Sequence, residues 1–200
     1  MATLTEVTDT DYPSETVPGI VYLDGTYYVM TPAGRIVGSE INDPTSWDAL
    51  NFIQCQAETD SGKAIARLAN YVVGFSEYTT EFFYNAGNPT GSPLLPMMSA
   101  QTNVGCANGM SVVNTENTIL WVGQTRTYGR GVYMFNGTNP QKVSTPFIDR
   151  ILMADDMTDV FAFGVKPAGH SFYVLVLGTV DRTLVYDFTT QEWHEWDFCE

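Results

Sequence analysis

Short runs of β-branched and aromatic residues follow one another along most of the chain, and each run ends near Gly, Pro, Asn or Asp. Runs of this length and composition, bounded by turn-forming residues, are typical of β-strands. The pattern therefore predicts an all-β protein built of antiparallel strands. The expected strands are residues 20–23, 27–30, 35–38, 71–75, 81–84, 118–122, 132–135, 172–177 and 183–188.

The residues between these runs favour tight turns. Asp24-Gly25 and Asn136-Gly137 supply the residues that tolerate positive φ, which two-residue hairpin loops require. Residues 32–34, Pro-Ala-Gly, suit a slightly longer loop. Neighbouring runs are therefore expected to pair with each other locally.

One segment, residues 144–153, follows a helical pattern instead. Ser144 or Thr145 can cap its first turn, and Pro146 suits the first helical position because proline lacks the amide hydrogen that would stay unpaired there. Its apolar residues recur at helical spacing, so one short helix is expected. These residues are Phe147, Ile148, Ile151 and Leu152.

The hydrophobic pattern repeats. Segments that begin at Thr26, Asn70, Asn117 and His170 each start a β run and continue, after a short turn, into a second one, with starts 44, 47 and 53 residues apart. This is the length of one propeller blade of three or four strands. The last unit also ends with a strand, a polar turn and a tryptophan, which resembles a kelch-type blade. We expect about four β-propeller-like blades, in a closed or an incomplete ring; a sandwich of meandering hairpins is the alternative.

The composition divides the chain into two parts. Residues 1–18 are rich in Thr, Asp, Glu and Pro with few large apolar side chains, which predicts an extended N-terminal arm. Residues 19–200 form the expected β-propeller-like domain, a length that suits one domain. Residues 85–93 contain too many Pro and Gly to continue a strand ladder, and they are expected to form a loop.

The charge balance limits the partners. The chain has 23 Asp and Glu against 9 Lys and Arg, a net charge of −14. Non-specific DNA binding depends on neutralising phosphates with basic side chains, so a duplex-reading surface is not expected. It would require the few basic residues to gather on one face. These are Arg126, Arg130, Lys142 and Arg150. No apolar stretch approaches the length of a membrane span, so membrane insertion is not expected.

Histidine and cysteine offer no recognisable reactive centre. A hydrolytic triad needs a histidine, but His170 begins an apolar strand and His194 lies in an alternating one, and no Gly-x-Ser-x-Gly motif occurs. The three cysteines, Cys55, Cys106 and Cys199, are spaced 51 and 93 residues apart, which fits neither a disulfide framework nor a zinc ligand pair. Reduced, partly buried thiols are expected.

Metal and phosphate sites are likewise not indicated. The acidic cluster at Asp155, Asp156 and Asp159 lacks the alternating ligands, the Gly and the distal Glu of a calcium loop, and a solvated loop is expected there. The glycines of residues 129–131 lack the Lys and the following helix of a phosphate-binding loop. We therefore expect no catalytic, cofactor-binding or metal-binding residues, no cofactor, and no enzyme activity.

Four tryptophans keep one alternative open. Exposed aromatic side chains can stack on sugar rings, so a glycan-binding or glycan-hydrolysing β-propeller is the second hypothesis for the function. It requires a concave site with exposed aromatics and, for cleavage, a pair of converging carboxylates. Packing inside a sheet protein is the commoner use of such residues. They are Trp47, Trp121, Trp193 and Trp196.

Several long strings suggest a family. They include GRIVGSEINDPTSWD at residues 34–48 and TEFFYNAGNPTGSP at residues 80–93, followed by residues 120–123, 144–152 and 169–174. Over residues 19–198 the chain resembles the packaged-DNA stabilisation proteins of short-tailed phages, the tail accessory or nozzle proteins of the P22 type. Members of that family are longer and start upstream of these strings, so a fragment, an excised domain or a prophage remnant is expected.

The resemblance implies a virion structural protein with β-propeller-like architecture. Such a protein is made in the bacterial host cytoplasm and lies in the phage tail, in a ring below the portal and its adaptor. There it helps close the DNA exit channel and retain packaged DNA. The implied partners are the portal adaptor, the tail needle or tailspike, and copies of itself. The family has no catalytic residues to transfer to this chain.

The acidity is compatible with this role. A wall with excess Asp and Glu repels a polyanion at close range, so a negatively charged channel would let DNA pass with low friction. The alternative is that the acidity only keeps the protein soluble. Exposed loops on a rigid scaffold are common docking surfaces, and residues 85–96 and 124–131 are the candidates.

Overall fold

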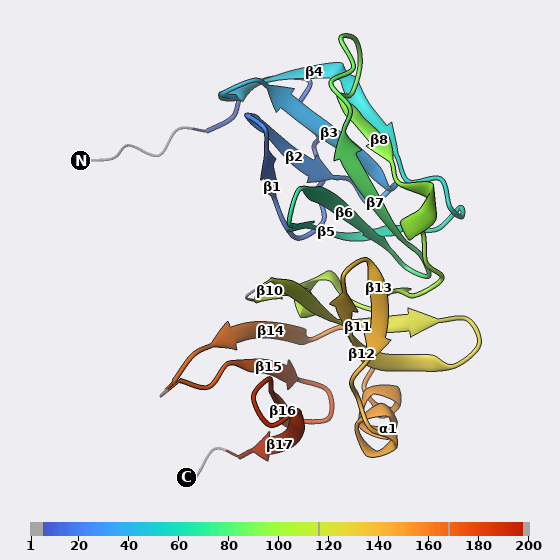
Figure 1. Ribbon diagram of the computed structural model, residues 1–200, viewed down its shortest axis with the longest axis vertical. Helices are drawn as coiled ribbons and strands as arrows, with labels where there is room; N and C mark the ends of the chain where they lie inside the picture. Colours follow the sequence, from blue (N-terminus) through green and yellow to red (C-terminus); the bar gives the residue numbers. More distant parts are fainter. Residues whose placement is uncertain (1–5, 116, 168, 198–200) are drawn as a thin grey trace.

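The computed structural model describes residues 6–115, 117–167 and 169–197. Within these ranges the chain forms four antiparallel sheets, and the strands of each sheet follow one another in chain order (Figure 1). We call these sheets blades 1 to 4. The all-β, propeller-like fold with about four repeats is thereby confirmed.

Each blade has a four-stranded meander as its framework. Blade 1 comprises β1 (Val21–Leu23), β2 (Thr26–Met30), β3 (Arg35–Glu40) and β4 (Asp43–Gln54). Blade 2 comprises β5 (Gly62–Leu68), β6 (Tyr71–Ser76), β7 (Thr80–Asn85) and β8 (Leu94–Pro96). Blade 3 comprises β10 (Val113–Thr115), β11 (Thr118–Thr125), β12 (Gly129–Asn136) and β13 (Asn139–Lys142), with β9 (Gly105–Cys106) paired to β11. Blade 4 comprises β14 (Val160–Val165), β15 (Phe172–Leu177), β16 (Arg182–Asp187) and β17 (Glu192–Trp196).

The repeat found in the sequence corresponds to the middle of each blade. The segments that begin at residues 26, 70, 117 and 170 contain β2, β6, β11 and β15, and the second run of each unit is the following strand of the same blade. Several outer strands lacked a hydrophobic signal. For example, β13 reads Asn-Pro-Gln-Lys and β4 is exposed at seven of its twelve residues. A strand at a sheet edge needs no apolar face, so its sequence can lack the hydrophobic pattern that predicts a strand.

The local signals at the first hairpin and at the helix are confirmed, but the expected turn at Asn136-Gly137 is shifted by one residue. Asn136 ends β12 paired with Asn139, so the loop is Gly137-Thr138, and Gly137 has φ of 64°. Asp24 and Gly25 have φ of 51° and 91° and form the two-residue loop between β1 and β2. The helix α1 (Pro146–Ala154) begins after Thr145, whose hydroxyl accepts a hydrogen bond from the Ile148 amide at 3.4 Å. Ile148 and Leu152 are the buried residues of α1, and they pack against blades 3 and 4.

The hydrophobic core lies between successive blades. Blades 1 and 2 meet through Tyr28 and Phe83, and blades 2 and 3 meet through Phe82 and Trp121. Blades 3 and 4 meet in a further hydrophobic cluster, which includes Leu120 of blade 3. The first strands also contact one another in sequence, β1 with β5, β5 with β10 and β10 with β14. Figure 1 shows the resulting succession of four sheets from blade 1 to blade 4.

The segment before β1 lies against blade 1. The Asp9 carboxylate accepts a hydrogen bond from the Trp47 amide at 2.9 Å, and the ring of Tyr12 packs edge-on against Trp47 at 4.9 Å between centroids. The amide of Val17 donates to the Met30 carbonyl at 2.8 Å. These contacts fix residues 6–18 on the scaffold; the division into an arm and a domain at residue 18 stays a prediction.

Two further sequence expectations concern the cysteines and membrane insertion. Cys55 and Cys106 are free and buried, whereas Cys199 lies outside the described residues. No helix in the part of the chain that the structure describes is long and apolar enough to cross a membrane.

Candidate functional site

A cleft of about 1180 Å³ lies where blades 2 and 3 meet the end of α1. Its lining includes Lys63, Arg126 and Arg130 together with Glu77 and Asp155. Charges of both signs therefore share the cleft. Whether the cleft can bind a polyanion depends on whether Arg126 and Arg130 already have partners within the protein.

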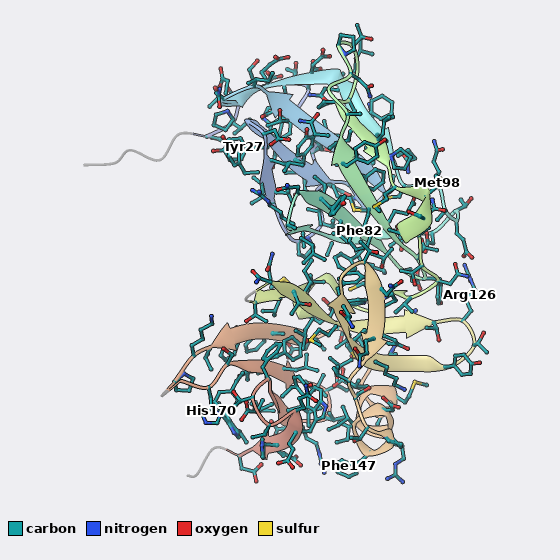
Figure 2. All side chains as sticks on the ribbon, in the orientation of Figure 1. Tyr27, Phe82, Met98, Arg126, Phe147 and His170 are labelled. Carbon is teal, nitrogen blue, oxygen red and sulfur yellow. The ribbon has the colours of Figure 1, made fainter. Side chains whose placement is uncertain are left out.

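Arg126 is neutralised by an acidic neighbour. Its Nη2 lies 2.8 Å from the Glu58 Oε2, and its guanidinium lies 4.0 Å from the ring centre of Tyr78. Figure 2 shows Arg126 on the side of the molecule where blades 2 and 3 meet. The hydrogen bond that Arg126 donates to Glu58 raises the pKa of Arg126 above its ordinary value. The positive charge of Arg126 thus has a partner before any ligand arrives.

Arg130 binds backbone oxygens at the end of the helix. Its Nη1 donates to the Leu152 carbonyl at 3.2 Å and to the Asp155 carbonyl, and its Nε donates to Gln124 at 3.4 Å. The last carbonyls of a helix have no partner within it, and a cation there also opposes the negative end of the helix dipole. Arg130 therefore holds α1 against blade 3.

Other basic side chains are engaged in the same way. Lys142 lies 2.6 Å from Asp149, and Arg182 lies 3.1 Å from Glu195. Of the four residues that would have to form a DNA-reading face, Arg126 and Arg130 share the cleft, whereas Lys142 and Arg150 are not part of its lining. Backbone carbonyls accept hydrogen bonds from Arg35 and Arg67.

The two histidines occupy blade 4. His170 Nδ1 lies 2.8 Å from Asp187 Oδ2, and its ring stacks on Phe172 at 5.8 Å. Burial acts to raise the pKa of Asp187, but the Thr189 amide and His170 outweigh it, so the pKa is lowered. His194 is exposed on β17. The absence of a catalytic role for either histidine stays a prediction.

The acidic cluster after α1 differs in one respect from the solvated loop expected. Asp155 is buried, and its carboxylate accepts hydrogen bonds from the amides of Met157 at 2.7 Å and Val180 at 3.2 Å. Asp156 is exposed, and the Thr158 hydroxyl lowers its pKa. The Asp155 carboxylate is needed inside to satisfy backbone amides, which sequence spacing does not reveal. Among the described residues, no group of His, Cys, Asp and Glu is arranged to hold a metal ion.

The tryptophans mostly pack inside the protein. Trp121 is fully buried, Trp47 is buried, and Trp193 is partly buried with its Nε1 donating to the Val143 carbonyl at 2.9 Å. Only Trp196 exposes a large part of its side chain, 44%. The tryptophans therefore provide no paired platform for sugar rings, and the glycan-binding alternative stays a hypothesis.

The two candidate docking segments, residues 85–96 and 124–131, are exposed over residues 85–87, 89–91 and 126–128, whereas Leu94 and Gly131 are buried in strands β8 and β12. In residues 85–96, the Asn85 carboxamide bonds the Gly87 amide and reaches Asp24 of blade 1, each at 2.9 Å. In residues 124–131, the tip residue Tyr128 is 82% exposed. The structure fixes how both loops are held, and their role in docking stays a prediction.

A further feature was not anticipated from the sequence. Phe161 and Phe163 on β14 are 44% and 42% exposed and stack on each other at 6.2 Å. Their strand was not predicted, although the continuous apolar run of residues 160–165, Val-Phe-Ala-Phe-Gly-Val, could have indicated it. An exposed pair of stacked aromatic rings on a sheet face is a candidate contact surface.

Residues 1–199 match the family model described as the phage stabilisation protein, bacteriophage P22 Gp10, a β-propeller. The chain belongs to this family. The phage stabilisation match confirms the resemblance to packaged-DNA stabilisation proteins, and the family is one of structural proteins rather than enzymes. The match also includes residues 1–18.

One solved structure has a partly similar fold. The crystal structure of BamB from Moraxella catarrhalis is similar over 85% of this phage stabilisation protein, at 12% sequence identity and a TM-score of 0.48. The chain spans 48% of the length of that structure. No curated protein sequence matches the chain.

Proposed function

We propose that this phage stabilisation protein is part of the tail of a short-tailed phage, where it helps close the portal channel and retain packaged DNA. Its partners in this proposal are the portal adaptor, the tail needle or tailspike, and copies of itself in a ring. It is made in the host cytoplasm and ends in the virion. Its contribution is shape and charge, with no bond made or broken. The family match supports a virion structural protein.

The observation on which the proposal depends is the state of the basic side chains. The chain has only nine Lys and Arg residues against 23 acidic ones. Within the residues that the structure describes, at least six of these nine have a carboxylate or a backbone carbonyl as partner: Arg35, Arg67, Arg126, Arg130, Lys142 and Arg182. Their charges thus already have partners within this chain, several of them in exposed ion pairs. The excess of carboxylates leaves a surface that repels phosphates within the Debye length, about 8 Å at physiological salt.

Such a surface suits a channel that DNA must leave quickly. Tight DNA binding requires several basic side chains that displace small counterions from the DNA phosphates. In this chain, most of the basic side chains already pair with a carboxylate or a backbone carbonyl. Repulsion without binding lets DNA pass, while docked neighbours supply the closure. The same acidity would also favour solubility, so the experiment must separate the two.

The test uses phage particles that lack this protein, supplied with the intact chain or with none. We expect particles assembled with the chain to keep their DNA during storage and those without it to release it. Mass spectrometry of purified particles should find the chain in the virion. Equal DNA release in the two preparations would contradict the proposal.

Charge is tested in the purified protein. We expect no binding to duplex DNA at low or moderate salt, because few cations are available to bind phosphate. A variant in which exposed Asp and Glu become Asn and Gln should be assayed for solubility and for DNA retention in particles. If it precipitates as isolated protein but retains DNA normally once assembled, the acidity serves solubility alone.

A further inference from the structure

The chain contains two asparagines that are followed by glycine, and the structure holds them differently. Asn108-Gly109 lies at the start of a short 3₁₀-helix (Gly109–Ser111), whereas Asn136-Gly137 lies at the hairpin between β12 and β13. An asparagine carboxamide can be attacked by the backbone nitrogen of the next residue, and glycine hinders this attack least because it has no side chain. Whether either pair reacts therefore depends on how freely its carboxamide and backbone can move.

The carboxamide of Asn108 is fixed at both of its ends. Its Oδ1 accepts a hydrogen bond from the Met110 amide at 2.8 Å, and its Nδ2 donates to the Met157 carbonyl at 2.7 Å. Gly109 is buried, and a Cβ there would lie 2.0 Å from the Lys63 carbonyl oxygen. The side chain and the backbone are both held in place, so Asn108 can react only after this part of the protein opens.

The hairpin at Asn136 imposes no such restraint. Asn136 and Gly137 are both exposed, and nothing lies within 4 Å of a Cβ built on Gly137. Among the residues that the structure describes, none forms a hydrogen bond with the Asn136 carboxamide or with the Gly137 amide. The hairpin leads into β13, the outermost strand of blade 3, and an exposed loop of this kind opens at much lower cost than a packed core.

We propose that Asn136 is a site of spontaneous deamidation, with water as the co-reactant. The Gly137 nitrogen loses its proton to hydroxide and bonds to the Asn136 Cγ. The bond from Cγ to Nδ2 breaks, and the leaving group takes a proton from water and departs as ammonia. Water then opens the resulting succinimide ring: addition at Cγ gives aspartate, and addition at the backbone carbonyl carbon gives isoaspartate. One amide and one water thus become one carboxylate and ammonia, and the chain gains one negative charge.

The isoaspartate product changes the backbone of blade 3. Its main chain runs through Cγ and is one methylene group longer at the residue that ends β12, opposite Asn139 of β13. The register of a hairpin is set by its turn, and β13 contains Lys142, whose ammonium lies 2.6 Å from Asp149 of α1. We expect the reaction to loosen the outer edge of blade 3 and its contact with α1. This chemistry is independent of the proposed tail role.

The experiment incubates the intact, folded chain at mildly alkaline pH and follows each asparagine by peptide mapping and mass spectrometry. We expect Asn136 to be converted at least about tenfold faster than Asn108, because Asn108 reacts only in the small fraction of molecules that is locally open. Asn139 is the control on the same hairpin. It is exposed, but Pro140 follows it and has no backbone N–H to lose. In denaturant, Asn108 and Asn136 should react at similar rates, because the fold restrains neither.

Two variants assign the added charge to one residue. Asn136→Gln replaces the reactive side chain by a longer one that would have to close a less favourable six-membered ring. Ion-exchange chromatography should therefore lose the more acidic form that accumulates in the unaltered protein. Asn139→Gln is the matched variant, and it should accumulate this form at the unaltered rate.

Three results would overturn the inference. The first is an equal rate of conversion for Asn136 and Asn108 in the folded chain. The second is an Asn136 that stays intact in the folded chain although both residues react in denaturant, which would show that the hairpin protects it. The third is an acidic form that accumulates unchanged in Asn136→Gln. Circular dichroism and thermal unfolding of each variant establish that the altered chains fold.

Discussion

The ring of Phe75 on β6 meets the indole of Trp121 on β11 at 5.3 Å between centroids and at 60°, across the interface of blades 2 and 3. Both side chains are fully buried, and the Trp121 Nε1 donates to the Gly105 carbonyl at 3.0 Å. Strand pairing holds each blade together, but contacts such as this one join one blade to the next. The stability of the protein therefore depends on a few large side chains between the sheets.

Trp121 gives the first prediction. We expect Trp121→Ala to lower the free energy of unfolding by about 3–5 kcal/mol, because it leaves a cavity and an unpaired carbonyl in a packed core. Trp196→Ala, at an exposed position of blade 4, should cost less than about 1 kcal/mol. Urea unfolding of the purified variants measures both. Similar losses would mean that blade interfaces contribute less than we infer.

Gly19 gives a prediction about close backbone approach. A Cβ at Gly19 would lie 2.0 Å from the Ile65 carbonyl oxygen, and φ there is +102°. Gly19→Ala should therefore destabilise the protein by about 2 kcal/mol or more, since both strain and a clash with backbone arise. Gly169→Ala is the control, because Gly169 has φ of +86° but nothing within 4 Å of a Cβ. Thermal unfolding should show a clearly larger shift for Gly19→Ala.

Asp9 gives a prediction about pH. The Trp47 amide lowers the pKa of Asp9, so the ionised carboxylate is stabilised in the folded protein. A group with a lowered folded pKa contributes fully above its unfolded pKa, about 3.9 for Asp, and loses that contribution as the pH falls through the folded value. Asp9→Asn should therefore be less stable than the unaltered protein at pH 6. The difference should shrink at pH values below about 4. Unfolding curves at several pH values test this; a constant difference would contradict it.

The buried thiols give a prediction about reactivity. Burial raises the pKa of Cys106 to about 12 and also raises the pKa of Cys55. The thiolate is the reactive form, so neither residue should react with a thiol reagent at pH 8 while the protein is folded. Peptide mapping after labelling, with and without denaturant, identifies the modified residue. Labelling of Cys55 or Cys106 in the folded protein would be inconsistent with a buried, protonated thiol.

The arginines of the cleft give a prediction that separates structure from DNA binding. Arg130→Ala removes a charged donor from the carbonyls at the end of α1, and we expect a loss of about 1.5–3 kcal/mol in stability. Arg126→Ala breaks an exposed ion pair with Glu58 and should change stability little. We expect no DNA binding by the unaltered protein or by either variant in filter binding at moderate salt, because both cations already have partners. DNA binding by the unaltered protein that either substitution abolishes would contradict the proposed function.

The amino-acid sequence predicted the parts of the fold that depend on local conformation or on a continuous hydrophobic pattern. Asp24-Gly25 adopts its turn, and Thr145 with Pro146 begins a helix, because these conformations depend on local sterics and on a donor two or three residues away. The middle strands of each blade were predictable because both their faces are buried. The net charge of −14 is likewise a property of the sequence alone.

Tertiary structure decided the rest. Strands such as β13 form because they pair with a neighbouring strand, since their own side chains have no apolar face. The sequence does not show that Asp155 is buried, that Arg130 reaches the end of α1, or that Phe161 lies on an exposed sheet face. Each of these depends on contacts between residues far apart in the chain, and such contacts exist only once the blades have packed. The hydrophobic pattern thus determined that there would be blades, and packing determined which side chains they leave exposed.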